Sequence, residues 1–360
     1  MKVCVDARMV LNSGIGTVIQ NFLINYSGEF ELSVIGNPDD LDYKKNYQII
    51  PSSTKIYSIK EQTELPRLIP KCDIFWSPHY NVPLLPIKAR KRVVTIHDVF
   101  HLAYRSEASI AQRIYSSVVM NQAVNRSDKV ITVSKFSESE IRKYLNVKAN
   151  KIEVIYNGVD HNLFRIINDN AGLTAIKKKY NLPDRFILYV GNVKPHKNLR
   201  NVIEAMKKLG GDHRLVIVGK KHGFITGDPL LFQQIEQDKS FAGRVIFTDF
   251  VPNEDLPYLY NLASLFVFPS FYEGFGLPPL EAMACGCTVV ASNAASIPEV
   301  CGDAATYFDP FNVNEIASKI SEALSGNREE QKRKGVERAA MFSWSDFYKK
   351  QTQVFKTLLS

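Results

Sequence analysis

The chain is 360 residues long, which exceeds the roughly 100–200 residues of one ordinary domain and predicts two domains. Apolar residues make up 45% of the chain and charged residues 23%, close to the values of soluble globular proteins, so disordered and fibrous classes are excluded. Basic residues outnumber acidic ones by 45 to 37. This excess leaves three kinds of partner open: nucleic acid, an anionic membrane surface or a phosphorylated small molecule.

The cysteines and the N-terminal residues indicate the compartment. Five scattered cysteines do not have the spacing of a disulfide framework, and Cys285 and Cys287 are too close for a Cys-x-x-Cys pair. The chain enters a strand pattern at Lys2 without the apolar stretch of a secretory signal. No run approaches the roughly 18 apolar residues of a transmembrane helix. We therefore expect a cytoplasmic protein with reduced cysteines.

Short β-branched runs alternate with amphipathic stretches through the first half of the chain. Largely apolar strands with helices between them indicate a parallel sheet that is covered on both faces. The predicted strands are Lys2–Val5, Glu31–Ile35, Lys55–Ile59, Asp73–Trp76, Arg92–Ile96, Lys129–Val133 and Lys151–Ile155, and the predicted helices are Gly16–Tyr26, Ile110–Val124 and Ser137–Leu145.

The alternation breaks at 166–174, where little periodicity remains, and we place an interdomain linker there. A second βα series follows, so the predicted fold class is α/β: two doubly wound Rossmann-like domains, residues 1–168 and 175–342, facing a central cleft. The strands of the second series are Phe186–Val190, Leu215–Val218, Val245–Phe247, Leu265–Phe268, Thr288–Ala291 and Thr306–Phe308, and its helices are Leu199–Leu209, Leu230–Lys239, Leu256–Ala263, Pro278–Ala284 and Val313–Leu324.

The first candidate motif, Ser13-Gly14-Ile15-Gly16-Thr17, lies between the first strand and the first helix. Paired glycines there would let the backbone approach an anionic or sugar ligand, and the helix N-terminus would favour negative charge. It is not a dinucleotide fingerprint, because Ile19 stands where the third glycine would be. A tight βα turn without a ligand is the alternative.

The second candidate is His97, which follows a predicted strand and precedes Asp98. Functional side chains of Rossmann-type sheets lie at such strand ends. A histidine there could orient a sugar hydroxyl or sense a phosphate. The alternative is a structural histidine.

The third candidate is the loop from Gly191 to Asn198, between the first strand and first helix of the second domain. A glycine, a basic cluster and a helix N-terminus together favour a diphosphate. Lys197 is the expected main phosphate ligand, with Lys194 and His196 secondary. A solvated basic loop is the alternative.

The fourth candidate is the most specific and reads Glu273-Gly274-Phe275-Gly276-Leu277-Pro278-Pro279-Leu280-Glu281. Two prolines suit only the first positions of a helix, so a helix begins there and places Glu281 in its first turn. The preceding glycines form a turn whose amides lack partners within the helix. Two carboxylates eight residues apart could therefore bracket a ligand, one on sugar hydroxyls and the other on ribose hydroxyls.

With these residues in place, the chain resembles the retaining nucleotide-sugar glycosyltransferases of family 4, which have the GT-B fold. The resemblance spans nearly the whole chain and is strongest from Lys129 onward. It is carried by Glu-x7-Glu from Glu273 to Glu281, by Gly286-Cys287-Thr288-Val289-Val290-Ala291-Ser292, by Pro298-Glu299-Val300-Cys301-Gly302-Asp303, by Asn157-Gly158-Val159-Asp160, by Thr132-Val133-Ser134 and by the Gly191–Asn198 loop.

The resemblance implies a role for each candidate. Glu273 would contact the transferred sugar and His97 would lie near it, while Lys197 would bind the diphosphate. It also implies that residues 343–360 form a closing helix that returns to the first domain. Many members carry Arg where this chain has Asn192, so the phosphate charge must rest on Lys197. The remaining donor-binding residues implied are Gly14 and Gly16 from the first domain, the amides of Phe275, Gly276 and Leu277, and Glu281 on the ribose.

The chemistry implied is transfer of a hexose from a nucleotide-sugar co-substrate to a hydroxyl of a glycan or lipid-linked glycan. The variant of the motif most resembles bacterial mannosyl- and rhamnosyltransferases of surface polysaccharide synthesis, so GDP-mannose is the first expected donor, followed by UDP-glucose-type and dTDP-rhamnose donors. We expect no cofactor and no required metal. Asp40-Leu41-Asp42 formally matches Asp-x-Asp, but we interpret it as a surface turn.

Two other classes of protein stay open: a GT-B sugar-nucleotide epimerase, which needs no acceptor, and a nucleic-acid-binding protein, for which the sequence offers no recognised module. The densest basic cluster is Lys88-Ala89-Arg90-Lys91-Arg92. It indicates either a solvated basic face or peripheral contact with anionic lipid at the inner face of the membrane.

Overall fold

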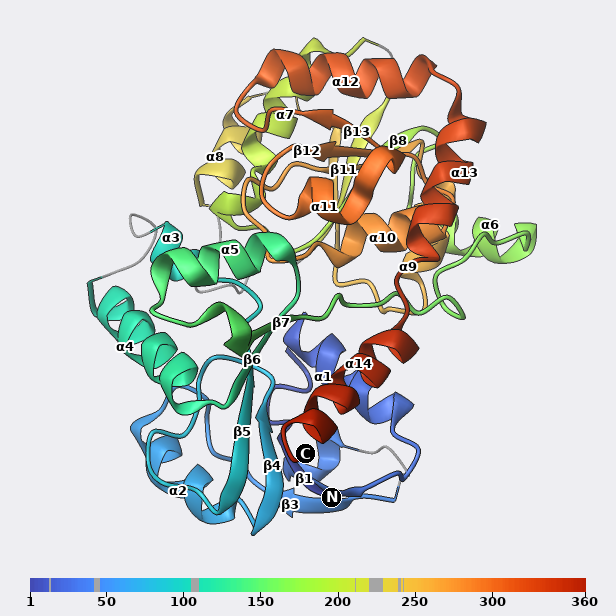
Figure 1. The fold of residues 1–360 in the computed structure, drawn as a ribbon. Coiled ribbons are helices and arrows are strands. Elements are labelled where there is room, and N and C mark those ends of the chain that lie inside the picture. Colours follow the sequence, from blue (N-terminus) through green and yellow to red (C-terminus); the bar gives the residue numbers. More distant parts are fainter. Residues whose placement is uncertain are drawn as a thin grey trace. The chain divides into compact units, whose positions relative to one another are not determined.

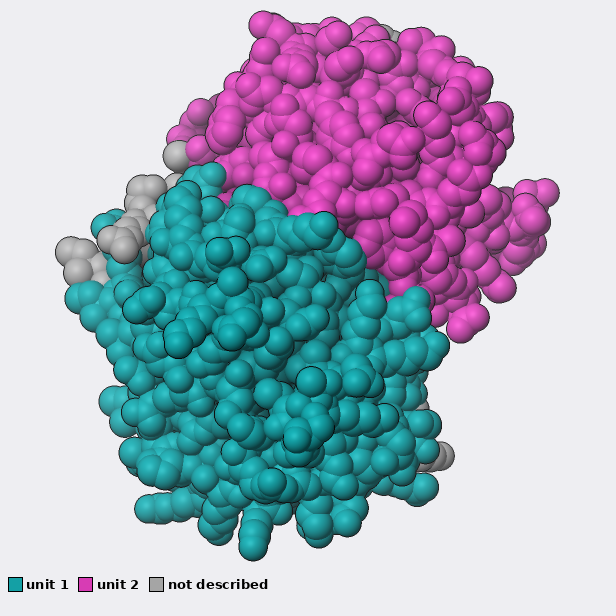
Figure 2. Space-filling view, in the orientation of Figure 1, with its two compact units in different colours: residues 1–158, 344–360 teal, residues 159–343 magenta. Residues whose placement is uncertain are grey.

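A computed structural model describes residues 1–12, 14–41, 46–104, 110–210, 212–219, 229–238, 241 and 243–360 (Figure 1). The chain divides into two compact units, which Figure 2 distinguishes by colour. Unit 1 consists of Met1–Gly158 and Trp344–Ser360, and unit 2 consists of Val159–Ser343.

The described part of unit 1 contains a seven-stranded parallel sheet in the order β3-β2-β1-β4-β5-β6-β7. The order reverses between β1 and β4, and doubly wound sheets bind ligands beyond the carboxyl ends of the strands at such a reversal. The strands are β1 (Lys2–Asp6), β2 (Glu31–Gly36), β3 (Gln48–Pro51), β4 (Cys72–Ser77), β5 (Ala89–Thr95), β6 (Lys129–Thr132) and β7 (Ile152–Val154).

Helices cover both faces of this sheet. Successive residues of a strand point to opposite faces, so neighbouring residues of β4 contact different helices. Phe75 packs with Leu65 of α2, whereas Trp76 packs with Phe22 of α1 and Phe355 of α14 at ring-centroid distances of 4.7 and 6.1 Å. The helices of unit 1 are α1 (Ile15–Asn25), α2 (Ile59–Leu68), α3 (Phe100–Ala103), α4 (Ile110–Arg126), α5 (Lys135–Tyr144) and α14 (Trp344–Thr357).

The described part of unit 2 contains a six-stranded parallel sheet in the order β10-β9-β8-β11-β12-β13. Its order reverses between β8 and β11, as that of unit 1 reverses between β1 and β4. The strands are β8 (Phe186–Val190), β9 (Arg214–Val218), β10 (Val245–Asp249), β11 (Leu265–Phe268), β12 (Val289–Ser292) and β13 (Ala305–Phe308).

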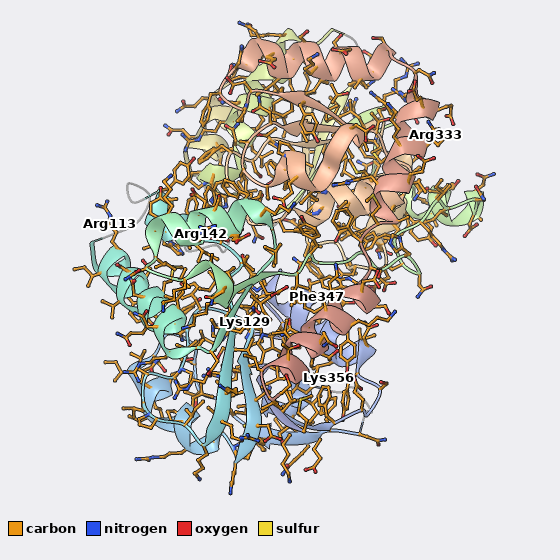
Figure 3. The ribbon with its side chains drawn as sticks, viewed as in Figure 1. Arg113, Lys129, Arg142, Arg333, Phe347 and Lys356 are labelled. Carbon is orange, nitrogen blue, oxygen red and sulfur yellow. The ribbon has the colours of Figure 1, made fainter. Side chains whose placement is uncertain are left out.

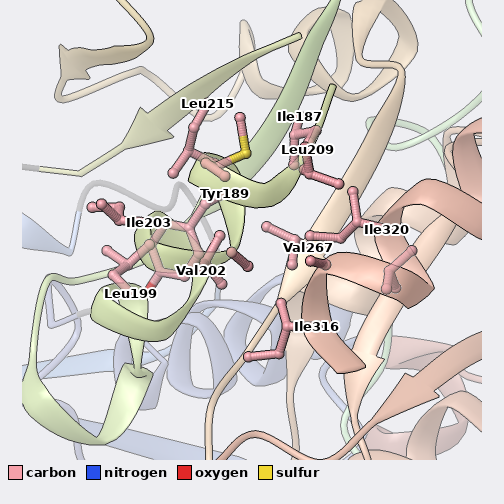
Figure 4. Close-up of a cluster of buried hydrophobic side chains, with 14 of the residues drawn as sticks. Ile187, Tyr189, Leu199, Val202, Ile203, Leu209, Leu215, Val267, Ile316 and Ile320 are labelled. Atoms are coloured by element: carbon pink, nitrogen blue, oxygen red, sulfur yellow. The ribbon is translucent and has the colours of Figure 1, made fainter. Parts of the chain in front are cut away.

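A buried apolar cluster fills one face of the unit 2 sheet (Figure 4). Ile187 and Tyr189, alternate residues of β8, contribute to it together with Val202 of α7 and Ile316 of α12. One face of the strand and the apolar faces of two helices therefore form one core. The helices of unit 2 are α6 (Asn170–Lys179), α7 (Leu199–Lys208), α8 (Pro229–Gln237), α9 (Leu256–Leu262), α10 (Leu277–Ala284), α11 (Ile297–Cys301), α12 (Val313–Ser325) and α13 (Arg328–Ala339).

The predicted strand at Lys55–Ile59 is wrong. The third strand is β3, seven residues earlier in the chain, and the segment before Ile59 leads into α2. Ser58 caps this helix by accepting a hydrogen bond from the N–H of Glu61, at 3.2 Å. A serine followed three residues later by a glutamate is the sequence pattern of a helix N-terminus, and here it outweighs the β-branched residues before it.

The chain passes from unit 1 to unit 2 between Gly158 and Val159, earlier than the linker predicted at 166–174. The N–H of Val159 donates to the carbonyl of Phe342, and that of Ile167 donates to the side chain of Asn261. Within the stretch, the side chain of Asp169 caps α6, so its polar residues mark the start of a helix in unit 2. Its last residues form the start of α6, and α14, the predicted closing helix, returns to lie beside α1 (Figure 1).

Candidate functional site

Two loops meet at the strand-order reversal of unit 2. One follows β8 and carries Lys197, and the other follows β11 and carries Glu273. Lys197 Nζ lies 2.5 Å from Glu273 Oε1, and the two side chains are 19% and 13% exposed. Because β8 and β11 are neighbouring parallel strands, the loops after their carboxyl ends meet at one edge of the sheet. The structure thus brings together two residues that the sequence placed in one donor site.

Further hydrogen bonds hold these loops against each other. The N–H of Phe271 donates to the carbonyl of His196 at 3.1 Å. The side-chain amide of the buried Asn198 donates to the carbonyls of Pro269 and Pro310, at 3.2 and 2.7 Å. Asn198 also has a left-handed backbone, φ 57°, which asparagine tolerates better than most residues. Sequence reasoning did not assign this residue, although an asparagine before a helix was a usable signal.

The predicted turn at Gly276 is present, with φ 103°, and α10 begins directly after it at Leu277. Pro278 and Pro279 have no N–H, so Leu277 and Leu280 supply the N–H groups of the first turn of α10 that have no partner within the helix. Such groups favour a negatively charged ligand. The buried Ser296 fixes the loop before them, because its hydroxyl donates to the carbonyls of Glu273 and Phe275, each at 2.9 Å. Sequence reasoning gave Ser296 no structural role, since a serine carries no sign that its partners are carbonyls some twenty residues away.

Glu281 lies in the second turn of α10, and the prediction of the first turn was wrong because the helix starts at Leu277. The hydroxyl of the buried Tyr260 donates to Glu281 Oε2 at 3.0 Å. Burial raises the pKa of Glu281 to about 7, and the Tyr260 hydrogen bond opposes part of that rise. Glu281 is therefore a carboxyl group whose charge changes near neutral pH.

The two candidate glycines of unit 1, Gly14 and Gly16, differ in the space that a side chain would find at each position. A Cβ on Gly16 would lie 2.4 Å from the carbonyl oxygen of Val10, so packing against the backbone explains this glycine. Gly14 has φ 72° at the N-terminus of α1, and a Cβ there would meet no atom within 4 Å. Of the pair, Gly14 is the one with space beside it. Ser13, the first residue of the motif, lies outside the described residues.

His97 follows β5 in unit 1 and has a fixed ring. Its Nε2 lies 2.9 Å from the carbonyl of Pro78, which can only accept, so Nε2 carries the proton and Nδ1 is left as an acceptor. Burial lowers the pKa of His97, with smaller opposing contributions from Pro78 and Asp98. A neutral imidazole at this strand end can accept a hydrogen bond from a sugar hydroxyl.

Three cations of the basic cluster have partners in the protein. Arg90 pairs with Asp73 and Lys91 with Asp128, both at 3.2 Å, and the Arg92 guanidinium donates to two main-chain carbonyls. These pairs are exposed and contribute little to stability. Figure 3 labels other basic residues of unit 1, among them Arg113 on α4 and Arg142 on α5. In the described ranges no helix is long and apolar enough to cross a membrane.

Within the described part of the chain, no group of three or more His, Cys, Asp or Glu side chains is placed to hold a metal ion. Of the Asp-x-Asp match, Asp40 ends a short 3₁₀ turn, Pro38–Asp40, and Asp42 lies outside the described residues.

The two doubly wound units, with cation and carboxylate at the strand-order reversal of one of them, define an enzyme of the two-domain GT-B class. Residues 13–163 match the family described as "Glycosyltransferase Family 4", and residues 174–340 match "Glycosyl transferases group 1". The chain belongs to these glycosyltransferases.

Relatives of known activity agree with this assignment. The chain is 33% identical to O-antigen chain mannosyltransferase B of Escherichia coli over 79% of this chain and 74% of the relative. It is 33% identical to O-antigen chain mannosyltransferase RfbU of Salmonella typhimurium over 67% of this chain and 62% of the relative.

Solved structures share the fold at low sequence identity. Sucrose-phosphate synthase from Thermosynechococcus elongatus superposes with a TM-score of 0.76 at 18% identity, covering 100% of this chain and 99% of the other. Anabaena HepE in complex with UDP-glucose gives a TM-score of 0.79 at 16% identity, covering 99% and 100%. The lipopolysaccharide glycosyltransferase WaaG gives 0.75 at 14% identity, covering 99% of each chain.

Proposed function

We propose that this glycosyltransferase moves a mannosyl group from GDP-mannose to a hydroxyl of a glycan or lipid-linked glycan, with retention of anomeric configuration. The observation that carries the choice of sugar is the 33% identity, over most of both chains, to an O-antigen mannosyltransferase. A cytoplasmic enzyme working at the inner face of the membrane would meet such an acceptor there.

The Lys197–Glu273 pair suits this donor. A diphosphate requires a cation, and the ammonium group of Lys197, which Glu273 holds in place, would supply it. The carboxylate of Glu273 can accept hydrogen bonds from sugar hydroxyls. In the chain alone these two charges neutralise each other. The donor would replace their contact with one contact to its phosphate and one to its sugar.

A sugar nucleotide carries its own leaving group, so the protein mainly orients the reactants and stabilises charge. Lys197 and the N–H of Leu277, the first residue of α10, would stabilise the departing diphosphate. Glu281, with Tyr260 behind it, would accept hydrogen bonds from the ribose. His97, neutral and with Nδ1 as an acceptor, would contact the reacting sugar.

A donor panel tests this function directly. Purified protein would be incubated with GDP-mannose, UDP-glucose, UDP-galactose or dTDP-rhamnose, with and without mannose oligosaccharides, and nucleotide release and products would be measured. We expect acceptor-dependent GDP release and a mannosylated product. If transfer occurs with UDP-glucose or dTDP-rhamnose but not with GDP-mannose, the proposed donor is wrong. Conversion of the donor sugar in the absence of acceptor would identify an epimerase.

A further inference from the structure

The strand-order reversal of unit 1 holds a buried polar cluster that the donor chemistry does not use. Asp6 ends β1 and His79 follows β4, the neighbouring strand, so both lie at the edge where doubly wound sheets bind ligands. We call this cluster the Arg8 network. Its members are Asp6, Arg8, Glu61, His79 and Asn81.

Arg8 joins two buried carboxylates. Its Nε and Nη2 donate to Asp6 at 2.8 and 2.7 Å, and Nη2 also donates to Glu61 at 2.6 Å. Burial alone would raise the pKa of Asp6, but the Arg8 guanidinium holds it well below its ordinary value. Buried ion pairs are weak sources of stability, because hydrophobic residues of similar volume often do as well. A role beyond folding is therefore the better reason for three buried charges here.

Two buried N–H groups of the network, Arg8 Nη1 and His79 Nε2, have no hydrogen-bond partner among the described residues. His79 Nδ1 accepts the N–H of Asn81 at 3.1 Å, so the proton of the neutral ring is on Nε2. Nε2 lies 3.5 Å from Asp6 Oδ2, within ion-pair range but outside hydrogen-bond geometry. The network therefore has donors for oxygen acceptors that the described protein does not supply.

The network extends to an aromatic surface. Asn81 Oδ1 accepts the hydroxyl of Tyr115 at 2.8 Å, and Glu61 accepts the N–H of Tyr57 at 2.9 Å. The ring centroids of Tyr80 and Tyr115 lie 6.2 and 6.3 Å from that of Tyr57. We call these three residues the tyrosine platform. Tyr57 is 49% exposed and Tyr115 38%, so large aromatic rings face solvent while buried charges hold them in place.

The backbone of Tyr57 shows that this placement is imposed. Its φ is 65°, a left-handed conformation that is an outlier for a bulky residue and is found mostly where surrounding contacts enforce it. The Glu61 carboxylate, itself fixed by Arg8, supplies such a contact through the Tyr57 N–H.

A pyranose ring matches this surface. Its C–H face packs against aromatic rings, whose faces carry partial negative charge, and its hydroxyls bond to phenol and amide groups. Rigid tyrosines lose little conformational entropy when they bind. The platform itself offers no cation, so it does not suit the diphosphate. In a glycosyltransferase, a glycan acceptor supplies such a neutral sugar.

We propose that the tyrosine platform binds a pyranose ring of the acceptor glycan and that the Arg8 network positions its rings. This assignment rests on the proposed function, because it requires a sugar acceptor. Tyr57, Tyr80 and Tyr115 contact the sugar, and Glu61 is a positioning residue that acts through Tyr57.

The test measures acceptor and donor parameters separately. With GDP-mannose saturating and α-mannobiose varied, Tyr57→Ala and Tyr115→Ala should raise the acceptor KM at least tenfold, while the Kd for GDP stays within twofold of wild type. Tyr115→Phe keeps the ring and loses only the Asn81 bond, so it should fall between wild type and Tyr115→Ala. Glu61→Gln should raise the acceptor KM more than it lowers kcat.

Ile114→Ala is the matched control, because Ile114 precedes Tyr115 on α4 and is also exposed. It should leave the acceptor KM unchanged. Saturation-transfer NMR with α-mannobiose gives a readout without turnover: the wild type should show sugar contacts that both tyrosine-to-alanine variants lose.

The outcomes separate the two hypotheses. An unchanged acceptor KM in Tyr57→Ala and Tyr115→Ala, with active wild type, overturns the platform and leaves the proposed function standing. Loss of binding to vesicles of anionic phospholipid in Tyr57→Ala, Tyr115→Ala and Ile114→Ala, with unchanged KM, would identify a lipid contact instead. Absence of transfer and of sugar contacts in the wild type overturns both hypotheses.

Discussion

Lys197 and Glu273 are 76 residues apart in sequence, yet their side chains form an ion pair of 2.5 Å in unit 2. Each side chain is mostly buried, and each charge lies against an opposite charge. Removing one partner of such a pair leaves an uncompensated charge, whereas removing both does not. Binding and stability thus depend on these residues in different ways, and variants can separate the two.

Lys197→Met and Glu273→Gln should each lower kcat/KM at least a hundredfold, about the loss seen when one transition-state donor is removed from other enzymes. Lys197→Met should also weaken GDP binding, because it removes the cation proposed for the diphosphate, whereas Glu273→Gln should leave GDP affinity nearly unchanged. Steady-state kinetics and GDP titrations check both. Near-wild-type turnover of Glu273→Gln would remove Glu273 from the site.

The double variant Lys197→Met/Glu273→Gln should be more stable than the sum of the single losses predicts. The reason is that neither remaining side chain carries an unpaired charge. Urea unfolding of the four proteins gives the coupling energy. A coupling energy of zero would show that the pair does not exist in solution.

Asn198→Ala should lower the free energy of unfolding by about 1–3 kcal/mol, because the carbonyl of Pro269 loses its side-chain donor, while that of Pro310 keeps the one from Asn201. Asn198→Gly loses the same hydrogen bonds but accepts the left-handed backbone, so it should be less destabilised than Asn198→Ala. Urea unfolding of both variants separates the side-chain contribution from the backbone contribution. Equal losses would show that the backbone conformation costs nothing.

Ser296→Ala should weaken GDP binding several-fold, because the loop that holds Glu273 and Phe275 loses its shared donor. Ser270→Ala is a matched control: Ser270 is equally buried in the same loop as Glu273, but its hydroxyl has no hydrogen-bond partner among the described residues. Its removal should leave GDP affinity unchanged and cost little stability. Calorimetric titration of both variants with GDP checks this, and equal effects would contradict the role of Ser296.

Donor binding should depend on pH through Glu281, whose pKa burial raises to about 7. Only the ionised carboxylate accepts hydrogen bonds from both ribose hydroxyls, so GDP affinity should be about tenfold lower at pH 6 than at pH 8. Binding at pH 7 should release protons, which titration in buffers of different ionisation enthalpy detects. Glu281→Gln should remove this pH dependence, and its persistence would place the titrating group elsewhere.

The same group affects folding with a defined sign. Between its ordinary pKa of 4.5 and about 7, the folded state holds a proton that the unfolded state has lost. The free energy of unfolding of the ligand-free chain should therefore fall as pH rises through this window, and Glu281→Gln should flatten that part of the profile.

Prediction from the sequence was most accurate for strands in which every residue is buried. The bounds of β8 and β11 match the predicted strands, because every residue in both is buried and apolar. Helix α13 was not predicted, since its sequence is highly charged and only Gly335 and Ala339 are buried. With so narrow a buried face, the helix has no apolar periodicity to detect.

The residues of the candidate site also differ in how far the sequence could predict them. Lys197 and Glu273 could be predicted to meet, because each follows a strand that has a recognisable pattern. Asn198 could be noticed as an asparagine before a helix, but the carbonyl partners of Asn198 and Ser296 could not be predicted, because every residue has a main-chain carbonyl. The Arg8 network was missed for a related reason. Only folding brings Glu61 of α2 to Arg8, which is 53 residues earlier in the chain.

The final helix has a consequence for how the protein is made. Unit 1 is discontinuous, since α14 follows all of unit 2 in the chain but packs on α1, where Tyr348 and Phe355 cover Phe22. On the ribosome, unit 2 can therefore complete its core before unit 1 does. Until α14 emerges, the nascent first unit exposes an aromatic surface that includes Trp76. A chaperone that recognises such surfaces would bind the chain during this interval and leave when α14 closes over it.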